Sequence, residues 1–266
     1  MNVALIDGDI AAYLVSAAAQ RDIDWGDGDA PVPWVNPKAA AKTAGELVNL
    51  WTRAAGAKRC IVAFTGHHNF RSVVYPEYKM NRSPAALRGV KDRRREKFAT
   101  VEVDGLEADD LLGMLATMPK AKGKHVVVTI DKDLRNVPGM HLNPRKDGED
   151  VTWVSETEAN RFWFQQALTG DPSDGYPGCP RIGPKKSAVI LEPWDGVDPV
   201  EGFKLILPAF VKVAKGDEEK GRAEALRMLW LARILRCGDY DKKRREVKLW
   251  GPEGPEFLKL EDVIGG

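Results

Sequence analysis

Short apolar runs separated by longer amphipathic segments dominate the pattern of hydrophobic and polar positions. Four apolar runs, at residues 3–7, 59–65, 100–104 and 125–130, have the length and the β-branched content of buried strands. The segments between them predict helices, because their apolar residues recur at helical spacing and Pro37 fits the first turn of one of them. This alternation predicts an α/β fold with a central, mostly parallel sheet flanked by helices.

Acidic residues follow three of the four predicted strands. These acids are Asp7 and Asp9 after the first strand, the run Glu107-Ala-Asp109-Asp110 after the third, and Asp131 and Asp133 after the fourth. In a parallel sheet the three junctions lie along one edge, so we expect the seven carboxylates to converge there. Carboxylates so close together raise one another's pKa unless they share a cation, and hard oxygen ligands favour magnesium or manganese. A single acid would be interpreted as a helix cap, but the recurrence at three junctions favours a metal site.

Weaker signals complete the expected sheet and its neighbours. Residues 140–143 and 150–154 are typical of edge strands. Ser155 and Glu158 form a capping-box pattern at the start of a helix, and residues 218–236 predict another helix with a buried apolar face.

Positive charge is concentrated in one segment, although the net charge of the chain is only +1. Between Arg71 and Lys97 there are nine Lys and Arg residues against three acids, with Tyr75 and Tyr78 among them. Such a segment suits nucleic acid, because aromatic rings stack on bases while cations bind phosphates. A solvated helix face is the alternative for the arginines near Lys97. The segment therefore predicts a polyanionic partner that binds at a defined place.

A turn rich in glycine and proline, from Gly170 to Gly183, precedes a predicted helix that carries Lys185 and Lys186. Free amides at the start of a helix, with lysines beside them, are suited to bind an anion. The order of the residues differs from that of a Walker loop, so the turn does not predict a P-loop nucleotidase.

Other common classes of site and location are disfavoured. Cys60, Cys179 and Cys237 are far apart and lack metal-ligand spacing, which argues against structural zinc and against a disulfide framework. No stretch approaches 18 consecutive apolar residues, so we expect no membrane partner and a cytoplasmic location.

In the order of its motifs the chain resembles the 5′-nuclease family, which includes flap endonucleases, polymerase-linked 5′ nucleases and bacteriophage 5′-to-3′ exonucleases. It is most similar to the exonucleases of short-tailed phages, which implies the cytoplasm of a host cell. The matching segments cover nearly the whole chain and are residues 3–9, 63–65, 69–71, 76–82, 106–110, 131–133, 170–188, 233–240 and 248–250. The resemblance implies a PIN-like nuclease core over residues 1–160 with a helical arch at 77–100. It also implies a helical duplex-binding lobe over residues 161–266, with a helix-hairpin turn and a C-terminal helix.

The resemblance also implies roles for single residues. The first metal would be held by Asp7, Glu107, Asp109 and Asp110. The second metal, or its waters, would be held by Asp131, Asp133, Asp171 and Asp174. The catalytic residues would be Asp109 and Asp110 together with Lys79 and Arg82, which contact the scissile phosphate. The residues expected to bind DNA are Arg71, Tyr78, Lys79, Arg82, Gly178, Gly183, Lys185 and Lys186, and the turn could hold a potassium ion.

The function implied is two-metal hydrolysis of duplex DNA from 5′ ends, with replication or recombination proteins as further partners. Three alternatives stay open: a flap endonuclease or RNase H-like enzyme that acts on RNA–DNA hybrids, a DNA-binding accessory with a weakened nuclease site, and a PIN-type ribonuclease. One departure from the family is Gly66, where many relatives carry an acid. We expect a weaker second metal site, with His67 or His68 as partial replacement, unless Gly66 only lets the backbone turn.

Overall fold

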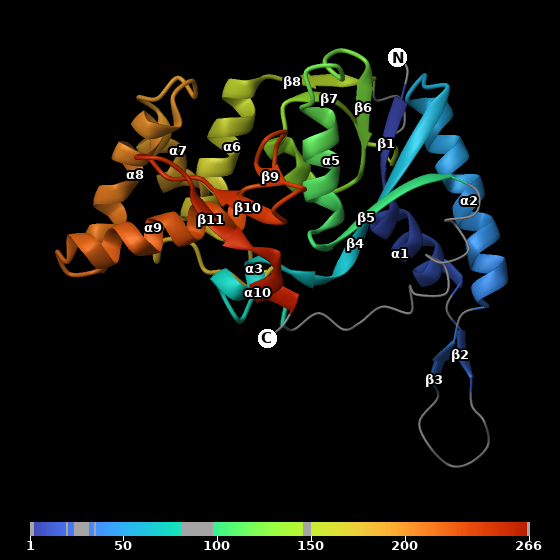
Figure 1. The fold of residues 1–266 in the computed structure, drawn as a ribbon, viewed down its shortest axis with the longest axis horizontal. Coiled ribbons are helices and arrows are strands. Elements are labelled where there is room, and N and C mark those ends of the chain that lie inside the picture. Colours follow the sequence, from blue (N-terminus) through green and yellow to red (C-terminus); the bar gives the residue numbers. More distant parts are fainter. Residues whose placement is uncertain are drawn as a thin grey trace.

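The computed structural model describes residues 3–19, 21–23, 32–34, 36–80, 98–145 and 150–264. Its centre is a six-stranded sheet in which neighbouring strands run parallel, except for an antiparallel strand at one edge (Figure 1). In spatial order the strands are β5 (Ala99–Gly105), β4 (Arg59–Asn69), β1 (Val3–Asp7), β6 (His125–Val128), β7 (Gly139–Leu142) and β8 (Thr152–Val154). The predicted α/β fold is confirmed. Of the two strands expected at an edge, β8 lies at the edge, whereas β7 lies between β6 and β8.

Helices cover both faces of the sheet. Successive side chains of β1 point to opposite faces of the sheet. Because helices bury both faces, all of these side chains are apolar up to Asp7, and the strand is a continuous apolar run. Ile6 packs towards α1 (Gly8–Ala19) and α2 (Pro37–Ala54). Leu5 packs on the other face, in one cluster with residues of α5 (Ala108–Ala116). The acids that follow the strands therefore lie at an edge of the sheet rather than on a face.

A group of four helices stands beside the sheet (Figure 1). They are α6 (Glu156–Thr169), α7 (Pro184–Leu191), α8 (Pro199–Val213) and α9 (Glu218–Ala232). Their shared core is aromatic: Trp163 and Phe164 of α6 are fully buried and their rings meet edge to face at 4.8 Å. The capping box of Ser155 and Glu158 at the start of α6 is confirmed.

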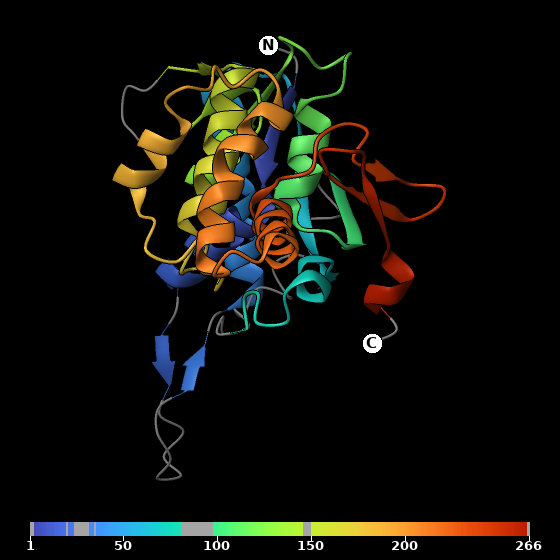
Figure 2. The ribbon, with the colours of Figure 1, turned by 90° about the vertical axis from the view of Figure 1, so that its left-hand side faces the viewer.

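The end of the chain differs from the expected helical lobe. Residues beyond α9 form a three-stranded sheet of β9 (Tyr240–Asp241), β10 (Glu246–Leu249) and β11 (Glu256–Lys259), followed by α10 (Leu260–Ile264). Val247 and Leu260 are fully buried in the cluster that also holds residues of α5. Figure 2 shows the red strands at the end of the chain beside the green helix α5. The last part of the chain thus packs on the part that holds the central sheet and α5 instead of extending the helical group.

A second small sheet joins β2 (Arg21–Ile23) to β3 (Val32–Trp34) in antiparallel register.

Among the described residues, no helix is long and apolar enough to cross a bilayer. The three cysteines are free thiols.

Candidate active site

Acids from three chain segments line one pocket at the edge of the sheet. α5 begins after Glu107, Asp131 precedes the short 3₁₀ helix η1 (Lys132–Asn136), and Asp174 lies in the turn after α6. Asp7, at the end of β1, does not line the pocket but interacts through its charge with Asp109 and Asp131. Because β1 and β6 are parallel neighbours, their carboxyl ends open on the same side. The carboxylates that line the pocket are those of Glu107, Asp109, Asp131, Asp133 and Asp174.

Burial and mutual repulsion raise the pKa of several of these acids. Burial raises the pKa of Asp7 to about 7, and the charges of Asp9 and Asp131 act in the same direction. Asp133 also reaches a pKa of about 7, again mainly through burial and then through Asp131. The pKa of Asp109 is raised well above its usual range by burial and by the charges of Asp7 and Asp131. A divalent cation would relieve this repulsion, so the donor set fits a hard metal ion.

Glu107 is the exception, because two cations keep it ionised. Burial alone would raise its pKa, but the charges of Lys79 and Arg71 outweigh burial and lower the pKa to about 2. Lys79 Nζ forms an ion pair with Glu107 and lies 3.5 Å from Asp174 Oδ2. Tyr78 Oη lies 3.0 Å from Glu107 Oε2 and 2.9 Å from Asp174 Oδ2.

The backbone holds Lys79 in this place. Its φ is 55°, a left-handed value that is uncommon for a residue with a side chain. Its amide donates to the carbonyl of Asp174 at 2.8 Å. These contacts hold Lys79 in the wall of the acidic pocket. Lys79 is the residue that the sequence predicted to contact the scissile phosphate.

Arg71 is not available to a duplex, contrary to the expectation from sequence. It is only 2% exposed, and its donors are used inside the protein. Nη1 and Nη2 each donate to Asp110 at 2.8 Å, and Nη1 also reaches Glu107 at 3.1 Å. The other acceptors are the carbonyls of Leu231 and Arg233. Arg71 therefore ties the acids of α5 to the end of α9.

Asp110 likewise differs from its expected role as a metal ligand and catalytic residue. It is fully buried and does not line the acidic pocket. Besides Arg71 it accepts the amides of Glu107 at 3.2 Å and Leu235 at 3.1 Å. With Glu107 it forms a capping box, so the interpretation as a cap is correct for this member of the acidic run.

Asp7, Asp9 and Asp171 also bind backbone amides. Asp7 accepts the amide of Ile10 at 3.0 Å, and Asp9 accepts that of Thr65 at 3.0 Å. Asp171 is buried and accepts the amide of Ser173 at 2.7 Å. In each of these acids one carboxylate oxygen accepts an amide, and this bond fixes the orientation of the carboxylate.

Two neutral side chains belong to the site although sequence reasoning missed them. Thr129 Oγ1 donates to Asp7 Oδ2 at 3.1 Å. Gln166 Nε2 donates to Asp133 Oδ1 at 2.7 Å and lines the pocket. Thr129 directly follows β6, and this position was the signal that could have identified it. Gln166 lies in the last turn of α6, and nothing in the sequence pointed to it.

The described carboxylates are gathered, but they are not grouped as ligands of one ion. Within the described part of the chain, no three His, Cys, Asp or Glu side chains have the arrangement of a metal site. The geometry instead pairs Glu107 and Asp174 with Lys79 and Tyr78. Side-chain rotation of the acids is therefore needed before several of them can share an ion.

Gly66 is explained by the packing of β4 against β5. A Cβ at this residue would lie 2.4 Å from the carbonyl oxygen of Val103, and 2.8 Å from Asp104 Cα. No acid can replace Gly66 without moving a strand. Neither neighbouring histidine lines the acidic pocket: His68 Nδ1 lies 3.0 Å from Asp104 Oδ1, which also accepts the amide of His67. The expected replacement of a missing acid by histidine therefore has no support among the residues of this pocket. The alternative, that Gly66 only lets the backbone turn, is not met either, because Gly66 lies within β4 and has no positive φ. The close approach of β5 explains the glycine.

The glycine-rich turn is a close-packed backbone structure. Gly178 has a φ of 66°, and a Cβ there would lie 2.2 Å from the amide nitrogen of Gly170. Gly183 is the N-cap of α7 and has open space around its Cα. Lys185 is exposed, whereas Lys186 Nζ donates to the carbonyl of Arg181 at 3.1 Å. Arg82 and most of the expected arch lie outside the described residues.

Comparisons with known proteins identify the family of the chain. Residues 2–159 match the family model described as the 5′-3′ exonuclease, N-terminal resolvase-like domain. The chain belongs to the 5′-3′ exonuclease family. It is 27% identical to an exodeoxyribonuclease of Enterobacteria phage T3 over 294 aligned residues, which cover 94% of the chain and 93% of the relative. It is also 27% identical to an exonuclease of Escherichia phage T7, with 94% of each protein covered.

A solved structure supports the fold of this family member. The T5 D15 protein, co-crystallised with metal ions, superimposes with a TM-score of 0.66 at 15% identity. The alignment covers 88% of the chain and 90% of the T5 protein. At this identity the likeness establishes the shared fold, and the assignment of single residues depends on the contacts described above.

Proposed function

We propose that the protein is a metal-dependent nuclease that hydrolyses phosphodiester bonds of duplex DNA from 5′ ends. The observation that carries the proposal is the acidic pocket with Lys79 and Tyr78 at its wall. Acids with raised pKa values beside a fixed cation are typical of phosphoryl-transfer sites. Membership of the 5′-3′ exonuclease family supports the polarity of the reaction.

The residues that would hold two divalent ions are those facing the pocket or coupled to it. Asp7, Glu107 and Asp109 would hold the first ion, magnesium or manganese. The acids for the second ion would be Asp131, Asp133, Asp171 and Asp174. Asp110 is left out of this set because Arg71 and two amides use its carboxylate. When bound, such ions lower the pKa of a water and offset the charge of the leaving oxygen.

The chain itself would orient the phosphate and the acids. Lys79 would leave its ion pair with Glu107 to bind a non-bridging oxygen of the scissile phosphate, where its charge offsets the developing negative charge. Tyr78 would then hold Glu107 and Asp174 in place of the lysine. Thr129 and Gln166 would orient Asp7 and Asp133 through their hydrogen bonds.

Duplex binding would involve the turn from Gly170 to Gly183 and the start of α7. Gly183 is exposed and has open space around it, so it allows a phosphate to approach the backbone, and exposed Lys185 adds a charge. Gly178, which was expected to bind DNA, is buried against the backbone of Gly170 and would shape the turn without touching the phosphate. Lys186, which is bonded to Arg181, would contribute less. A potassium ion at this turn and an arch that includes Arg82 are further parts of the proposal.

A structure-specific flap endonuclease, with or without RNA primer removal, is the second candidate, because the same pocket would serve both reactions. Duplexes labelled at the 5′ end, matched 5′ flaps and RNA-primed duplexes distinguish the two. Release of labelled mononucleotides or short oligomers from the blunt duplex supports the exonuclease. Cleavage confined to the flap junction would replace it with the endonuclease.

A further inference from the structure

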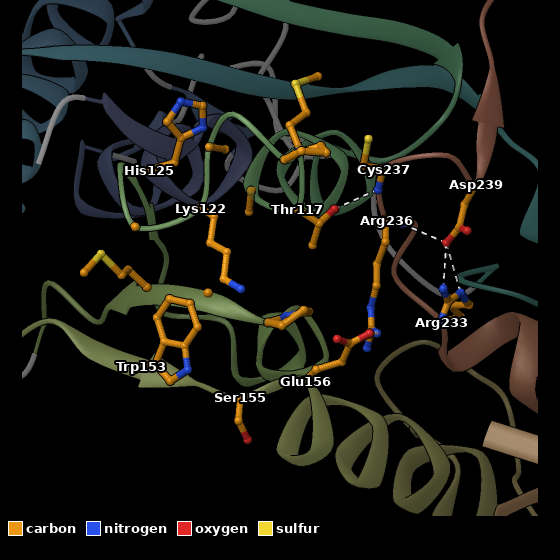
Figure 3. A pocket seen from close by; sticks show the side chains of 18 residues that line it. Thr117, Lys122, His125, Trp153, Ser155, Glu156, Arg233, Arg236, Cys237 and Asp239 are labelled. Carbon is orange, nitrogen blue, oxygen red and sulfur yellow. Dashed lines mark hydrogen bonds and ion pairs between the residues drawn. The ribbon is translucent and has the colours of Figure 1, made fainter. Parts of the chain in front are cut away.

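A pocket of about 500 Å³ lies at the end of α5 that is remote from the acids (Figure 3). Ala116 and Thr117, at the end of α5, line it together with His125 at the start of β6. The nine residues of α5 rise about 1.5 Å each, so roughly 14 Å of helix separates this pocket from the acids. None of the residues assigned to the proposed nuclease reaction lines it.

Arg236 is a buried cation in the wall of this pocket without a close carboxylate. The residue is 9% exposed, and its Nη1 and Nη2 donate to neutral oxygens, Asn160 Oδ1 at 2.8 Å and the Asn136 carbonyl at 2.9 Å. Glu156, which is itself exposed, comes only to 4.0 Å, and Nε has no acceptor within the described ranges. Burial, and after it the charge of Arg233, lower the pKa of Arg236 to about 9. A buried cation that is paired so poorly attracts an anion.

Lys122 supplies a second, flexible cation. It is exposed and lines the pocket, and Figure 3 shows its side chain directed towards the side where Trp153 lies. The charge of Arg233, by contrast, is paired with Asp239 at 2.8 Å. Lys122 and Arg236 are therefore the cations that would interact with an anion bound in the pocket.

Part of the remaining wall is apolar and includes a half-exposed aromatic ring, while Thr117, His125, Ser155, Glu156 and Asp239 make other parts of it polar. Trp153, on the edge strand β8, is 51% exposed, and Met118 is 40% exposed. The apolar side chains around the cavity are those of Met118, Pro119, Pro138, Met140 and Trp153. A half-exposed indole beside a methionine is costly to leave in water and is suited to stack on a planar ring.

We propose that this pocket binds a nucleoside 5′-monophosphate, with the base on Trp153 and the phosphate between Lys122 and Arg236. Its volume falls within the roughly 300–1,000 Å³ of small-molecule sites. A lysine and a guanidinium both bind phosphate, and the ring supplies the second point of attachment. That such nucleotides are present as reaction products rests on the proposed function, whereas the binding itself does not.

Calorimetric titration of the full chain tests the proposal. Deoxyadenosine and deoxythymidine monophosphates are added in excess chelator, so that no divalent ion links them to the acids. We expect each nucleotide to bind about tenfold or more tightly than the nucleoside or inorganic phosphate alone, because the two contacts reinforce each other. Trp153→Ala and Lys122→Ala should each weaken binding by about tenfold, the scale of a lost stacking or charge-assisted contact.

Matched controls separate the pocket from general charge and hydrophobicity. Lys124→Ala and Phe257→Ala remove an exposed cation and a 56% exposed ring that lie outside the pocket, and should leave the affinity unchanged. Affinity that is equal in Trp153→Ala and the parent, or the absence of saturable binding, would overturn the proposal. Displacement of the nucleotide by duplex DNA would also overturn it, because the ligand would then lie in the acidic pocket. Since no cleavage is measured, these results do not depend on nuclease activity.

Discussion

Arg71→Met is expected to destabilise the fold by removing the cation that two buried carboxylates share. In the native protein the guanidinium holds both oxygens of Asp110 at 2.8 Å and reaches Glu107 at 3.1 Å. It also donates to the carbonyl of Leu231 at 3.1 Å, which joins α5 to the end of α9. Methionine keeps much of the apolar stem but provides no donor, so Asp110 stays buried with an uncompensated charge.

The loss should be about 3–5 kcal/mol at neutral pH, which is the cost of removing one partner from a buried ion pair. Lys79 still pairs with Glu107, so the uncompensated charge is chiefly that of Asp110. The double variant Arg71→Met with Asp110→Asn should therefore be more stable than Arg71→Met alone. Arg71→Lys keeps the charge but not the two-pronged geometry, and should lose roughly half as much.

The effect should depend on pH with a definite sign. The pKa of Glu107 is about 2 in the folded protein, below the ordinary glutamate value of 4.5, because Lys79 and Arg71 outweigh the opposing effect of burial. This carboxylate therefore contributes stability above about pH 4.5 that is lost as the pH falls towards 2. Without Arg71 one of the two cations that lower the pKa of Glu107 is gone, so Glu107 protonates at a higher pH and the difference between variant and parent should be largest at pH 7 and smaller at pH 5.

Urea unfolding, followed by tryptophan fluorescence and circular dichroism at both pH values, measures these differences. An unchanged midpoint, or a loss that is the same at pH 7 and pH 5, would refute the electrostatic reasoning. DNA binding by the folded variant is a further check. For this variant, the slope of the logarithm of the binding constant against the logarithm of the salt concentration should match that of the parent. A lost phosphate contact would reduce that slope by about 0.9.

Three further variants test other parts of the site. Asp109→Asn should abolish cleavage yet raise the thermal midpoint without metal by a few degrees, because the raised pKa of Asp109 marks its charge as destabilising at neutral pH. Lys185→Ala should lower the salt slope of duplex binding by about 0.9, whereas Lys204→Ala, an exposed lysine on α8 paired with a glutamate, should change it less. Gly66→Asp should lower the thermal midpoint, since its Cβ would meet the carbonyl oxygen of Val103 at 2.4 Å. It should not lower the magnesium concentration needed for half-maximal activity. A Gly66→Asp protein of unchanged stability would contradict the steric argument.

The sheet and the gathering of acids could be predicted because both follow from local pattern. Apolar runs give buried parallel strands, and the ends of parallel strands share an edge, so Asp7 and Asp131 had to approach each other. Capping at Ser155 was equally local. These features depend on neighbours in the chain and on one topological rule.

The roles within the acidic run could not be predicted in the same way. Asp109 and Asp110 are adjacent, yet one lines the pocket and the other is buried against Arg71. Which of them faces the pocket depends on a cation from α3 (Arg71–Val74) and on the amide of Leu235, more than a hundred residues later. The same holds for Gly66, whose constraint is the neighbouring strand. Long-range contacts, not propensity, decide these cases.

The most direct test of the central claim is product analysis with the acidic pocket intact and altered. The parent protein and Asp109→Asn are incubated with duplex DNA labelled at the 5′ end or at the 3′ end, with magnesium or with excess chelator. The account predicts that the parent with magnesium releases short 5′-labelled products at once, while the 3′-labelled strand shortens gradually. It also predicts no cleavage by Asp109→Asn or in chelator, with duplex binding retained. Full cleavage in chelator, or by Asp109→Asn, would contradict it.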